Sequence, residues 1–479
     1  MIDVRRESSP AGDLRRLFEM QRDAYLAQPY PSPGERRDRL QRLAALIEVH
    51  EQDIVAAIAA DFGTRPAQET RLAELFVIAA GIRHARRNLG PWMAQQRVPT
   101  PLYLWPGRSR VLRQPLGVVG VISPWNYPVQ LALLPALAAL AAGNRVMLKP
   151  SELTPRTSAL LERIVAQHFS ADEFAVVTGG PDVGDLFSRL PFDHLFFTGS
   201  TAVGRKIALA AAANLTPLTL ELGGKSPALI HADADLRVAA PRLATGKLLN
   251  AGQTCIAPDY ALVPASRVDA LAAAIHDSVA SLYPSFRDNP DYCSIINDAH
   301  YRRLVALIDD AVQKGARAVA LEPPGVTATL SPIRKLAPMM LIGVNDSMAV
   351  MKEEIFGPVL PIEAYDSLDQ AIDKINARPR PLSLYMFGGD TAARKKVLDR
   401  TTAGGVTLDD TLLHFSNENL PFGGIGASGI GAYHGERGFL TFTHQKAVFI
   451  QSRLSFTWLL RPPYGKRFER VLALLKKIS

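Results

Sequence analysis

The apolar residues of the first 90 positions recur with the period of a helix. Leu40 and Ile47 belong to one such stripe. The segment that leads into it, Ser32–Glu35, is a capping box: a serine N-cap, a proline at the first helical position and a glutamate three residues after the cap. Further helices are predicted at 51–60 and 68–88, the last of them stopping at a Gly-Pro pair. This helical opening carries no recognisable chemistry.

From Gly117 onward, short and wholly apolar runs alternate with helical stretches. Such alternation predicts doubly wound parallel sheets, because parallel strands need crossovers between them. Ligand sites are then expected at the carboxyl ends of the strands. Strands are predicted at 118–122, 145–148, 174–177, 194–198, 218–222 and 228–230, and again in a second α/β unit at 260–263, 318–321, 359–364, 382–387 and 405–408.

Residues 98–115 interrupt this alternation with prolines and short alternating segments. They predict a hairpin with strands at Leu102–Trp105 and Ser109–Leu112, which turns at Pro106-Gly107. Because exposed strand edges seek partners, we expect this hairpin and a strand near Gln445–Gln451 to form an arm that pairs with another subunit.

The last 24 residues predict an amphipathic helix that is too short and too charged to span a bilayer. Two surfaces could receive it: the partner subunit near its substrate entrance, which we favour, or a membrane. Its apolar side consists of Phe468, Val471, Leu472, Leu474 and Leu475, and its basic side of Arg461, Lys466, Arg467, Arg470, Lys476 and Lys477.

Length and composition narrow the function classes. A chain of 479 residues needs two or three domains. No apolar run approaches the ~18 residues of a spanning helix. The net charge of +8 comes from 54 basic and 46 acidic residues without a dense basic stripe, so no nucleic-acid partner is expected. Two cysteines exclude a disulfide framework and, with a start that does not resemble a signal peptide, predict a reducing cytoplasm. No metal site is expected.

One of the two cysteines, Cys255, stands between a predicted helix and a predicted strand. Gly252 and Pro258 flank it, so its backbone forms a turn. A thiol presented in a tight turn is a candidate nucleophile. The alternative is a core thiol, since free cysteine is among the most often buried residue types.

Polar residues follow several predicted strands. Asn126 is fixed between Pro124 and Pro128, and its amide could stabilise an oxyanion or simply form a turn. Lys149 and Glu152 could hold ribose hydroxyls, or could be a solvated surface pair.

Two further strand ends carry candidate chemistry. The turn Gly199–Gly204 opens a helix whose N-terminus suits a phosphate, although it does not match the G-x-G-x-x-G fingerprint. Glu221 lies at an apolar strand end, where burial would raise its pKa toward that of a general base. The alternative is a salt bridge to Lys225. Glu354, near another strand, could belong to a plain acidic turn.

The order of these signals resembles the aldehyde dehydrogenase superfamily over residues 30 to 455. Two motifs are specific to it: Glu221-Leu222-Gly223-Gly224-Lys225-Ser226-Pro227 and Gly252-Gln253-Thr254-Cys255. Within the family the chain is similar to the shorter class 3 branch and to bacterial coniferyl aldehyde dehydrogenases. The segments that carry this similarity are 123–128, 257–260 and 431–435.

The resemblance implies a mechanism. Cys255 would attack the aldehyde carbon, Asn126 and the Cys255 N–H would hold the oxyanion, and Glu221 would activate the water that releases the acid. The expected cofactor is NAD or NADP, with NAD favoured by Glu152. The implied cofactor-binding residues are Trp125, Lys149, Glu152, Gly199, Ser200, Gly204, Leu222, Glu354 and Phe356. The implied substrate pocket consists of Tyr127, Leu131, Leu249, Thr254, Phe422 and Tyr433.

The apolar pocket walls suggest a hydrophobic aldehyde, either aromatic, such as a cinnamaldehyde, or a medium to long aliphatic one. The family fold implies a Rossmann-type cofactor domain over 1–97 and 117–221, an α/β catalytic domain over 222–439, an oligomerisation arm over 98–116 and 440–455, and a tail over 456–479. A homodimer is expected. Two departures from many relatives, the absence of a carboxylate just after Gly431 and Pro135 in place of a lysine, match class 3 members.

Two rival functions share the scaffold. A coenzyme-A-acylating dehydrogenase would use the same thiol without a hydrolytic base, and Glu221 argues against it. A non-catalytic binding or structural protein would tolerate loss of the thiol or of the cofactor turn, yet Cys255 and Gly199–Gly204 are intact. A cysteine hydrolase would need no dinucleotide site.

Overall fold

A layer of helices opens the chain, which the computed structural model describes over residues 10–321 and 333–478. The predicted capping box is present: the Ser32 hydroxyl accepts the Glu35 N–H, and the Glu35 carboxylate accepts the Ser32 N–H at 2.7 Å. The helices are α1 (Pro10–Ala27), α2 (Pro33–Val49), α3 (Glu51–Phe62), α4 (Ala67–Thr70) and α5 (Val77–Met93), with the π-helical η1 (Arg71–Phe76) between the last two.

The prediction of one uninterrupted helix over 68–88 was wrong in two respects. The π-helical η1 divides it, and α5 continues through Pro91 instead of stopping there. A proline close to the end of a helix removes one backbone hydrogen bond, and the remaining turn can still close. The Ala94 N–H donates to the carbonyl of Gly90 at 3.1 Å and ends the helix.

The first sheet has the strand order β15-β7-β6-β3-β4-β5 and is parallel except for β15. Its five parallel strands bear out the predicted positions closely. They are β3 (Val118–Ile122), β4 (Arg145–Lys149), β5 (Phe174–Val176), β6 (His194–Thr198) and β7 (Leu218–Glu221), and the sixth strand is β15 (Gly429–Ile430). The crossover helices are α6 (Gln130–Ala142), α7 (Pro155–His168), α8 (Pro181–Ser188) and α9 (Thr201–Ala212).

Helix α6 lies at the centre of the molecule. Twelve of its residues are buried, which agrees with its apolar character on every face. It packs between the first sheet, α2, α5 and the later helix α16 (Gly435–Thr441). The loop that precedes it is therefore held from several sides.

The second sheet has the order β10-β11-β12-β9-β8-β13-β14, with β10 antiparallel. Its strands are β8 (Pro227–Ile230), β9 (Tyr260–Pro264), β10 (Arg317–Ala320), β11 (Met339–Ile342), β12 (Val359–Tyr365), β13 (Ser383–Phe387) and β14 (Gly405–Leu408). Its helices are α10 (Leu236–Leu248), α11 (Val268–Leu282), α12 (Asp298–Gln313), α13 (Ala349–Lys352), α14 (Leu368–Asn376) and α15 (Thr391–Arg400), with short 3-10 turns η3 (Leu249–Gly252) and η4 (Ala265–Arg267). Strand β11 was not predicted.

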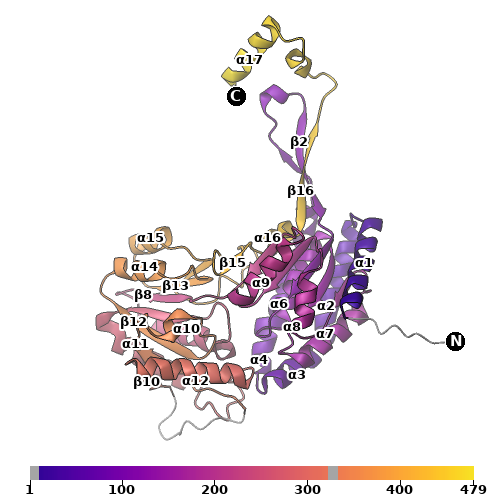
Figure 1. Ribbon diagram of the computed structural model, residues 1–479. Coiled ribbons are helices and arrows are strands. Elements are labelled where there is room, and N and C mark those ends of the chain that lie inside the picture. The colour runs from indigo at the N-terminus through magenta and orange to yellow at the C-terminus, as the bar shows by residue number, and fades with distance from the viewer. Residues whose placement is uncertain (1–9, 322–332, 479) are drawn as a thin grey trace, which may run out of the picture.

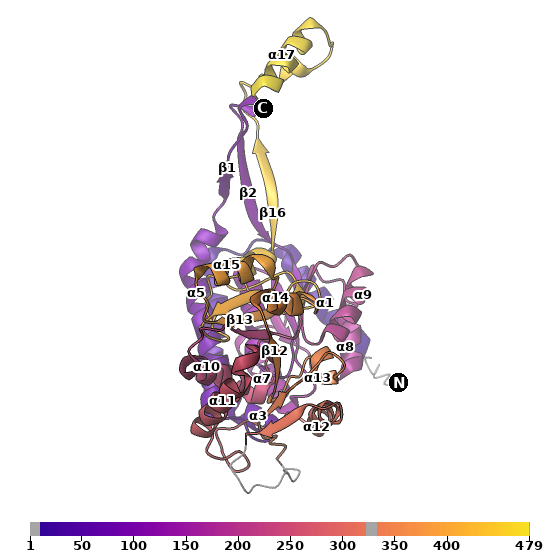
Figure 2. The same ribbon diagram turned by 90° about the vertical axis from the view of Figure 1, so that its left-hand side faces the viewer.

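An arm projects away from both sheets (Figures 1 and 2). It consists of β1 (Gln96–Val98), β2 (Arg108–Pro115) and β16 (Thr443–Ile450), and β2 pairs with β16 over its whole length. The predicted strand at Leu102–Trp105 was wrong: Leu102–Leu104 is a 3-10 turn, η2. Prolines at 99, 101 and 106 remove backbone donors around this turn. The strand that pairs with β2 is therefore β1, which lies earlier in the chain.

The predicted tail helix is present as α17 (Lys466–Ile478), preceded by the 3-10 turn η5 (Thr457–Leu460). It lies at the far end of the arm (Figures 1 and 2), where it contacts η5 and η2. The guanidinium carbon of Arg467 lies 5.3 Å from the centre of the Trp458 ring. Among the helices of the described ranges, none is both long enough and apolar enough to cross a membrane.

Candidate active site

Cys255 lies in a strained turn where α10 ends near the second sheet. Asn250 and Ala251 adopt left-handed φ angles of 53° and 51°. Gly252 follows with a φ of 76°, and a Cβ there would collide with the carbonyl of Gly357. The turn thus requires glycine at 252, and it leaves the Cys255 side chain half-buried.

The turn is held from below by the side chain of Gln253. Its amide nitrogen donates to the carbonyls of Asn250 and Ser294, both at 3.0 Å, and its oxygen accepts the Ile296 N–H at 2.9 Å. The second cysteine, Cys293, is buried there and donates to the Asn250 side-chain oxygen at 3.2 Å. The two cysteines therefore occupy different environments, one at the turn and one in the core beneath it.

Glu221 is the last residue of β7 and is 3% exposed. Neither carboxylate oxygen has a hydrogen-bond partner among the described residues, and burial raises its pKa well above the ordinary value. The alternative salt bridge to Lys225 does not form, because the Lys225 ammonium pairs with Asp259 and donates to the Val350 carbonyl at 2.8 Å. An unpaired buried carboxyl is suited to proton transfer.

The environment of Cys255 disfavours the ionised form of its thiol. Burial raises its pKa to about 12, and the carboxyl groups of Glu354 and Glu221 contribute to the increase. A thiol with this pKa needs a base to become a nucleophile.

The Asn126 side chain is 2% exposed and joins the nucleophile turn directly. Its amide nitrogen donates to the Gln253 carbonyl at 3.1 Å. The Asn126 carbonyl in turn accepts from the Asn250 side chain at 3.0 Å. Because an amide nitrogen carries two hydrogens, the bond to Gln253 fixes the orientation of the second.

The predicted ribose-binding pair lies at the carboxyl end of β4. The Lys149 side chain is 4% exposed, so the lysine of the pair is buried. The Lys149 ammonium lies 3.4 Å from Glu152 and donates to the Pro150 carbonyl at 3.2 Å. The carboxylate of Glu152 is 39% exposed and remains accessible to a ligand.

The predicted phosphate turn is built for close backbone approach. Ser200 caps α9, since its hydroxyl accepts the Val203 N–H at 3.3 Å. A Cβ at Gly204 would come within 2.6 Å of the buried side chain of Leu222, so α9 packs closely against the residue that follows β7. Along the same edge of the sheet, two buried hydroxyls have no partner in the described part of the chain: those of Ser123 and Thr198. These unsatisfied donors and the exposed helix N-terminus fit a dinucleotide.

Three residues predicted to hold the nicotinamide end of the cofactor come together. The Phe356 ring, on a backbone with φ 53°, meets the Trp125 ring edge-on at 5.4 Å between centroids. A Cβ at Gly223 would collide with the Glu354 carboxylate, so these two segments are in contact. Burial, with the nearby charge of Asp259, raises the pKa of Glu354 to about 8.

The residues predicted as substrate walls, together with Cys255 and Glu221, form the region that we call the chamber. The Tyr127 and Thr254 hydroxyl groups are hydrogen-bonded to each other at 2.7 Å. Phe422 and Tyr433 face one another across a backbone bridge, and Tyr433 has an unpartnered hydroxyl within the described residues. Burial raises the pKa of Tyr433 well above its ordinary value, and Glu221 and Cys255 add to that increase. Leu131 is buried in the first turn of α6, and Leu249 is half-buried in η3.

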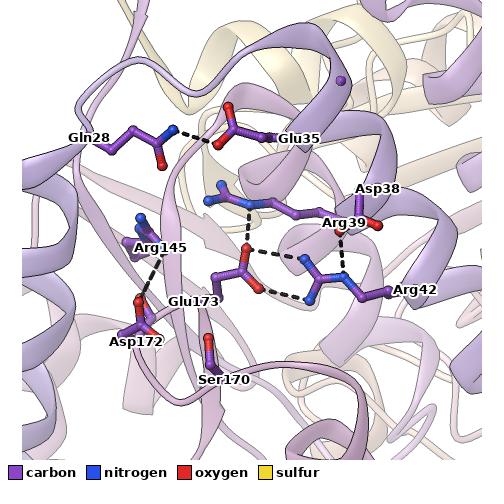
Figure 3. Close-up of a pocket in the computed structure, with 10 residues that line it drawn as sticks. Gln28, Glu35, Asp38, Arg39, Arg42, Arg145, Ser170, Asp172 and Glu173 are labelled. Carbon is purple, nitrogen blue, oxygen red and sulfur yellow. Dashed lines mark hydrogen bonds and ion pairs between the residues drawn. The ribbon is translucent and has the colours of Figure 1, made fainter.

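A separate hollow of about 520 Å³ lies at the opposite edge of the first sheet (Figure 3). Arg145 opens β4 and Glu173 precedes β5, so both lie at the amino ends of strands. The charges here are paired: the Glu173 carboxylate binds Arg39 at 2.9 Å and Arg42 at 2.8 Å. This region, which we call the Glu173 network, ties α2 to the sheet and takes no part in the chamber.

Sequence reasoning missed several residues that shape the site. Arg65, between α3 and α4, and Glu74, in η1, contact the Asn126 loop. Asn250 and Gln253 brace the turn. One signal was available, because Glu74 falls on the buried stripe of its helix between Thr70 and Ile78.

A family model for the aldehyde dehydrogenase family matches residues 8–448. The chain belongs to this family. It is an NAD(P)-dependent aldehyde dehydrogenase, which confirms the prediction made from the order of the motifs.

Relatives of this aldehyde dehydrogenase support the predicted branch. A probable coniferyl aldehyde dehydrogenase of Pseudomonas aeruginosa is 48% identical and matches 96% of this chain and 95% of that protein. Aldehyde dehydrogenase family 3 member A2 of Macaca fascicularis is 40% identical, over 87% of this chain and 84% of the relative. The predicted similarity to class 3 and coniferyl aldehyde dehydrogenases is confirmed.

Solved structures of the family share the fold of this aldehyde dehydrogenase. The substrate-bound state of Staphylococcus aureus AldH aligns with a TM-score of 0.91 at 39% identity, over 96% of this chain and 99% of that one. A Mycobacterium tuberculosis aldehyde dehydrogenase complexed with NAD+ aligns with a TM-score of 0.82 at 30% identity, over 93% and 91%. The predicted α/β aldehyde dehydrogenase fold is therefore correct.

Proposed function

We propose that this enzyme oxidises a hydrophobic aldehyde to the carboxylic acid through a covalent adduct on Cys255. One observation carries the assignment: a half-buried thiol in a strained turn has its pKa raised in part by a buried carboxyl, Glu221, that has no hydrogen-bond partner in the described ranges. Lys225, the cation that could have neutralised that carboxyl, is held by Asp259.

The reaction begins when the Cys255 thiol loses its proton. The thiolate attacks the aldehyde carbon, and the Asn126 amide with the Cys255 N–H binds the oxygen that becomes negative. Loss of a hydride then converts the tetrahedral adduct on Cys255 into a thioester. Glu221 removes a proton from a water molecule, and that water hydrolyses the thioester to release the acid.

The hydride acceptor is the nicotinamide ring that NAD or NADP supplies when bound. Its binding residues are proposed along the carboxyl edge of the first sheet, with Ser200 and the α9 N-terminus at the phosphates and Trp125, Glu354 and Phe356 at the nicotinamide end. The accessible carboxylate of Glu152 supports NAD, because it would accept from a ribose 2′-hydroxyl and repel a 2′-phosphate.

The substrate class follows from the walls of the chamber. Tyr127, Leu131, Phe422 and Tyr433 are buried aromatic or aliphatic side chains, and the Tyr127 hydroxyl is already committed to Thr254. An aromatic aldehyde such as coniferyl aldehyde fits these walls and agrees with the name of the Pseudomonas aeruginosa relative. Medium and long aliphatic aldehydes are the competing substrates, and kcat/KM values across both series rank them.

Absorbance of reduced nicotinamide tests the function as a whole. The purified chain should reduce NAD when an aromatic aldehyde is added, at the same rate with and without coenzyme A. A rate that requires coenzyme A would identify an acylating dehydrogenase, and absence of any reduction with every aldehyde would support a non-catalytic protein.

The arm supports a homodimer. Strand β16 lies at the edge of the three-stranded arm sheet, which offers an unpaired row of backbone groups to a second subunit. Sedimentation at micromolar concentration should give twice the chain mass of 52.1 kDa. A monomeric profile would contradict this assignment.

The tail is proposed to pack on the partner subunit rather than on a membrane. Arg467 already stacks on Trp458, and Tyr464 packs edge-on against Phe468, so part of the apolar side is covered within the chain. Flotation with anionic liposomes should therefore be equal for the full chain and for a chain truncated before Arg461. Stronger flotation of the full chain would favour the membrane.

A further inference from the structure

Two charged residues of the N-terminal helical layer, Arg65 and Glu74, are fully buried behind the Asn126 loop. Both side chains are 0% exposed. Glu74 belongs to the π-helical η1, a type of irregularity that often accompanies functional sites. Burying a charge is unfavourable unless its hydrogen bonds are satisfied, so the partners of these two residues indicate what they do.

Both residues bind the backbone of the segment that carries Asn126. Arg65 Nη1 donates to the Asn126 carbonyl at 2.6 Å. Glu74 Oε2 accepts the N–H groups of Val129 and Gln130 at 2.8 Å and 3.0 Å, at the start of α6, where a negative charge is favourable. The segment is thereby held at both ends, with Asn126 at one end and the first turn of α6 at the other.

Arg65 and Glu74 make closer contacts to this segment than to each other. Arg65 Nη2 and Glu74 Oε1 are 3.4 Å apart, and neither atom makes a hydrogen bond within the described residues. Their hydrogen bonds to the loop are all shorter, at 2.6 to 3.0 Å. A buried ion pair contributes little net stability by itself, so tight contacts to the loop are the better account of its presence.

Arg65 also reaches the nucleophile turn through Tyr127. Its guanidinium lies 4.8 Å from the centre of the Tyr127 ring and 4.9 Å from that of Phe62. The Tyr127 hydroxyl binds Thr254, the residue before Cys255. The Arg65 guanidinium therefore contacts the backbone of the oxyanion donor Asn126 directly and reaches Thr254, next to the nucleophile, through Tyr127.

We propose that Arg65 and Glu74 are positioning residues that hold the Asn126 amide where it binds the oxyanion formed on attack by Cys255. The inference rests on the proposed function of Asn126 and Cys255. A shift of about 1 Å in such a donor is enough to lower a rate by roughly 10²-fold. The two residues touch no reacting atom and act only through the loop.

The test measures the pre-steady-state burst of NADH in the full chain with saturating NAD and aldehyde. Arg65→Lys and Glu74→Gln should each slow the burst by roughly 10- to 100-fold, with the KM for NAD changed by less than about twofold. Glu74→Gln keeps one acceptor oxygen and so provides a second variant if Arg65→Lys does not fold. Matched controls are Arg39→Lys and Glu173→Gln in the Glu173 network, which should lower the unfolding temperature without slowing the burst.

A double-mutant cycle separates positioning from general loss of structure. If Arg65 acts through Asn126, then Arg65→Lys should slow the burst by less than about threefold in an Asn126→Ala background. An equal loss in both backgrounds, or a folded Arg65→Lys enzyme with the parent burst, would overturn the proposal. Neither result would affect the assignment of Cys255, whose own substitution tests the proposed function.

Discussion

The chamber around Cys255 is largely buried and the Glu173 network is half-buried, and their carboxylates have different partners. In the network, the Glu173 carboxylate binds Arg39 and Arg42. In the chamber, the carboxylate of Glu221 and the hydroxyl of Tyr433 have no hydrogen-bond partner in the described ranges. The two regions lie at opposite edges of the same sheet.

The pKa values of the carboxyl groups in the two regions are shifted in opposite directions. Burial alone would raise the Glu173 pKa, but hydrogen bonds from Arg42 and the charges of Arg39 and Arg42 bring it below the ordinary value. Burial raises the Glu221 pKa, and no charged neighbour opposes that increase. A paired carboxylate holds the fold together, whereas an unpaired buried one can exchange a proton with substrate or water.

The largest effect is expected from removing the sulfur of the chamber. Cys255→Ser should lower turnover by roughly 10³-fold or more, because a serine hydroxyl is far harder to deprotonate in the same setting. Cys293→Ser should stay within about twofold of the parent, since its hydroxyl can still donate to Asn250. Steady-state rates of the two folded variants compare them. An active Cys255→Ser enzyme, or a folded but inactive Cys293→Ser enzyme, would reverse the assignment of the nucleophile.

The next effect is expected from Glu221→Gln, which leaves the thiol and the oxyanion donor in place. Acylation and hydride transfer should still occur, while hydrolysis of the thioester should slow by roughly 10²- to 10⁴-fold without its base. The variant should release about one NADH per active site and then stall. Rapid-mix absorbance follows the burst, and intact mass should show an acyl group on Cys255.

Two outcomes would change the role of Glu221. Steady turnover near the parent rate would remove it as the base for hydrolysis. Absence of both burst and adduct would assign it to the activation of Cys255, an assignment that the high pKa of that thiol already makes physically reasonable.

The residues that sequence reasoning found and those it missed differ in how far their signal extends along the chain. Cys255 and Glu221 stand in short motifs whose turns and strand ends are local, so their place at the site could be predicted. Arg65 contacts Asn126, which lies 61 positions later in the chain, and no pattern in the sequence around Arg65 predicts that contact. Only a tertiary structure brings the two together.

The fold shows the same division. The parallel strands were predicted well because each is a short apolar run between turns. The segment Leu102–Trp105 was misassigned because its alternation resembles a strand, whereas the surrounding prolines prevent pairing. The domain boundaries and the contact between subunits stay predictions.

A smaller effect concerns pH. A protonated carboxyl cannot accept a proton, so the rate of deacylation in the parent enzyme should rise with pH until the raised Glu221 pKa is passed. The slope should approach roughly tenfold per pH unit below that pKa. Glu221→Gln should abolish this rise, and stopped-flow traces at fixed NAD concentration would show whether it persists.

The smallest effect, on stability, should have opposite signs in the two regions. The raised pKa of Glu221 means that the folded state holds a proton that the unfolded chain loses above about pH 4.3, so folding becomes less favourable as pH rises from there to the folded pKa. Glutamine has no proton to lose. The unfolding temperature of Glu221→Gln should therefore exceed that of the parent at pH 8, and the gap should narrow at pH 5.

Glu173 has a lowered pKa, so its contribution to stability is present above the pKa of the unfolded chain and is lost as pH falls through the folded pKa. Glu173→Gln should thus unfold at a lower temperature than the parent at pH 8, with a smaller difference in acid. Thermal unfolding of both variants at the two pH values decides the comparison. If Glu221→Gln also destabilises the enzyme at pH 8, then the Glu221 carboxylate of the parent has stabilising partners. The contrast between the two regions would then be wrong.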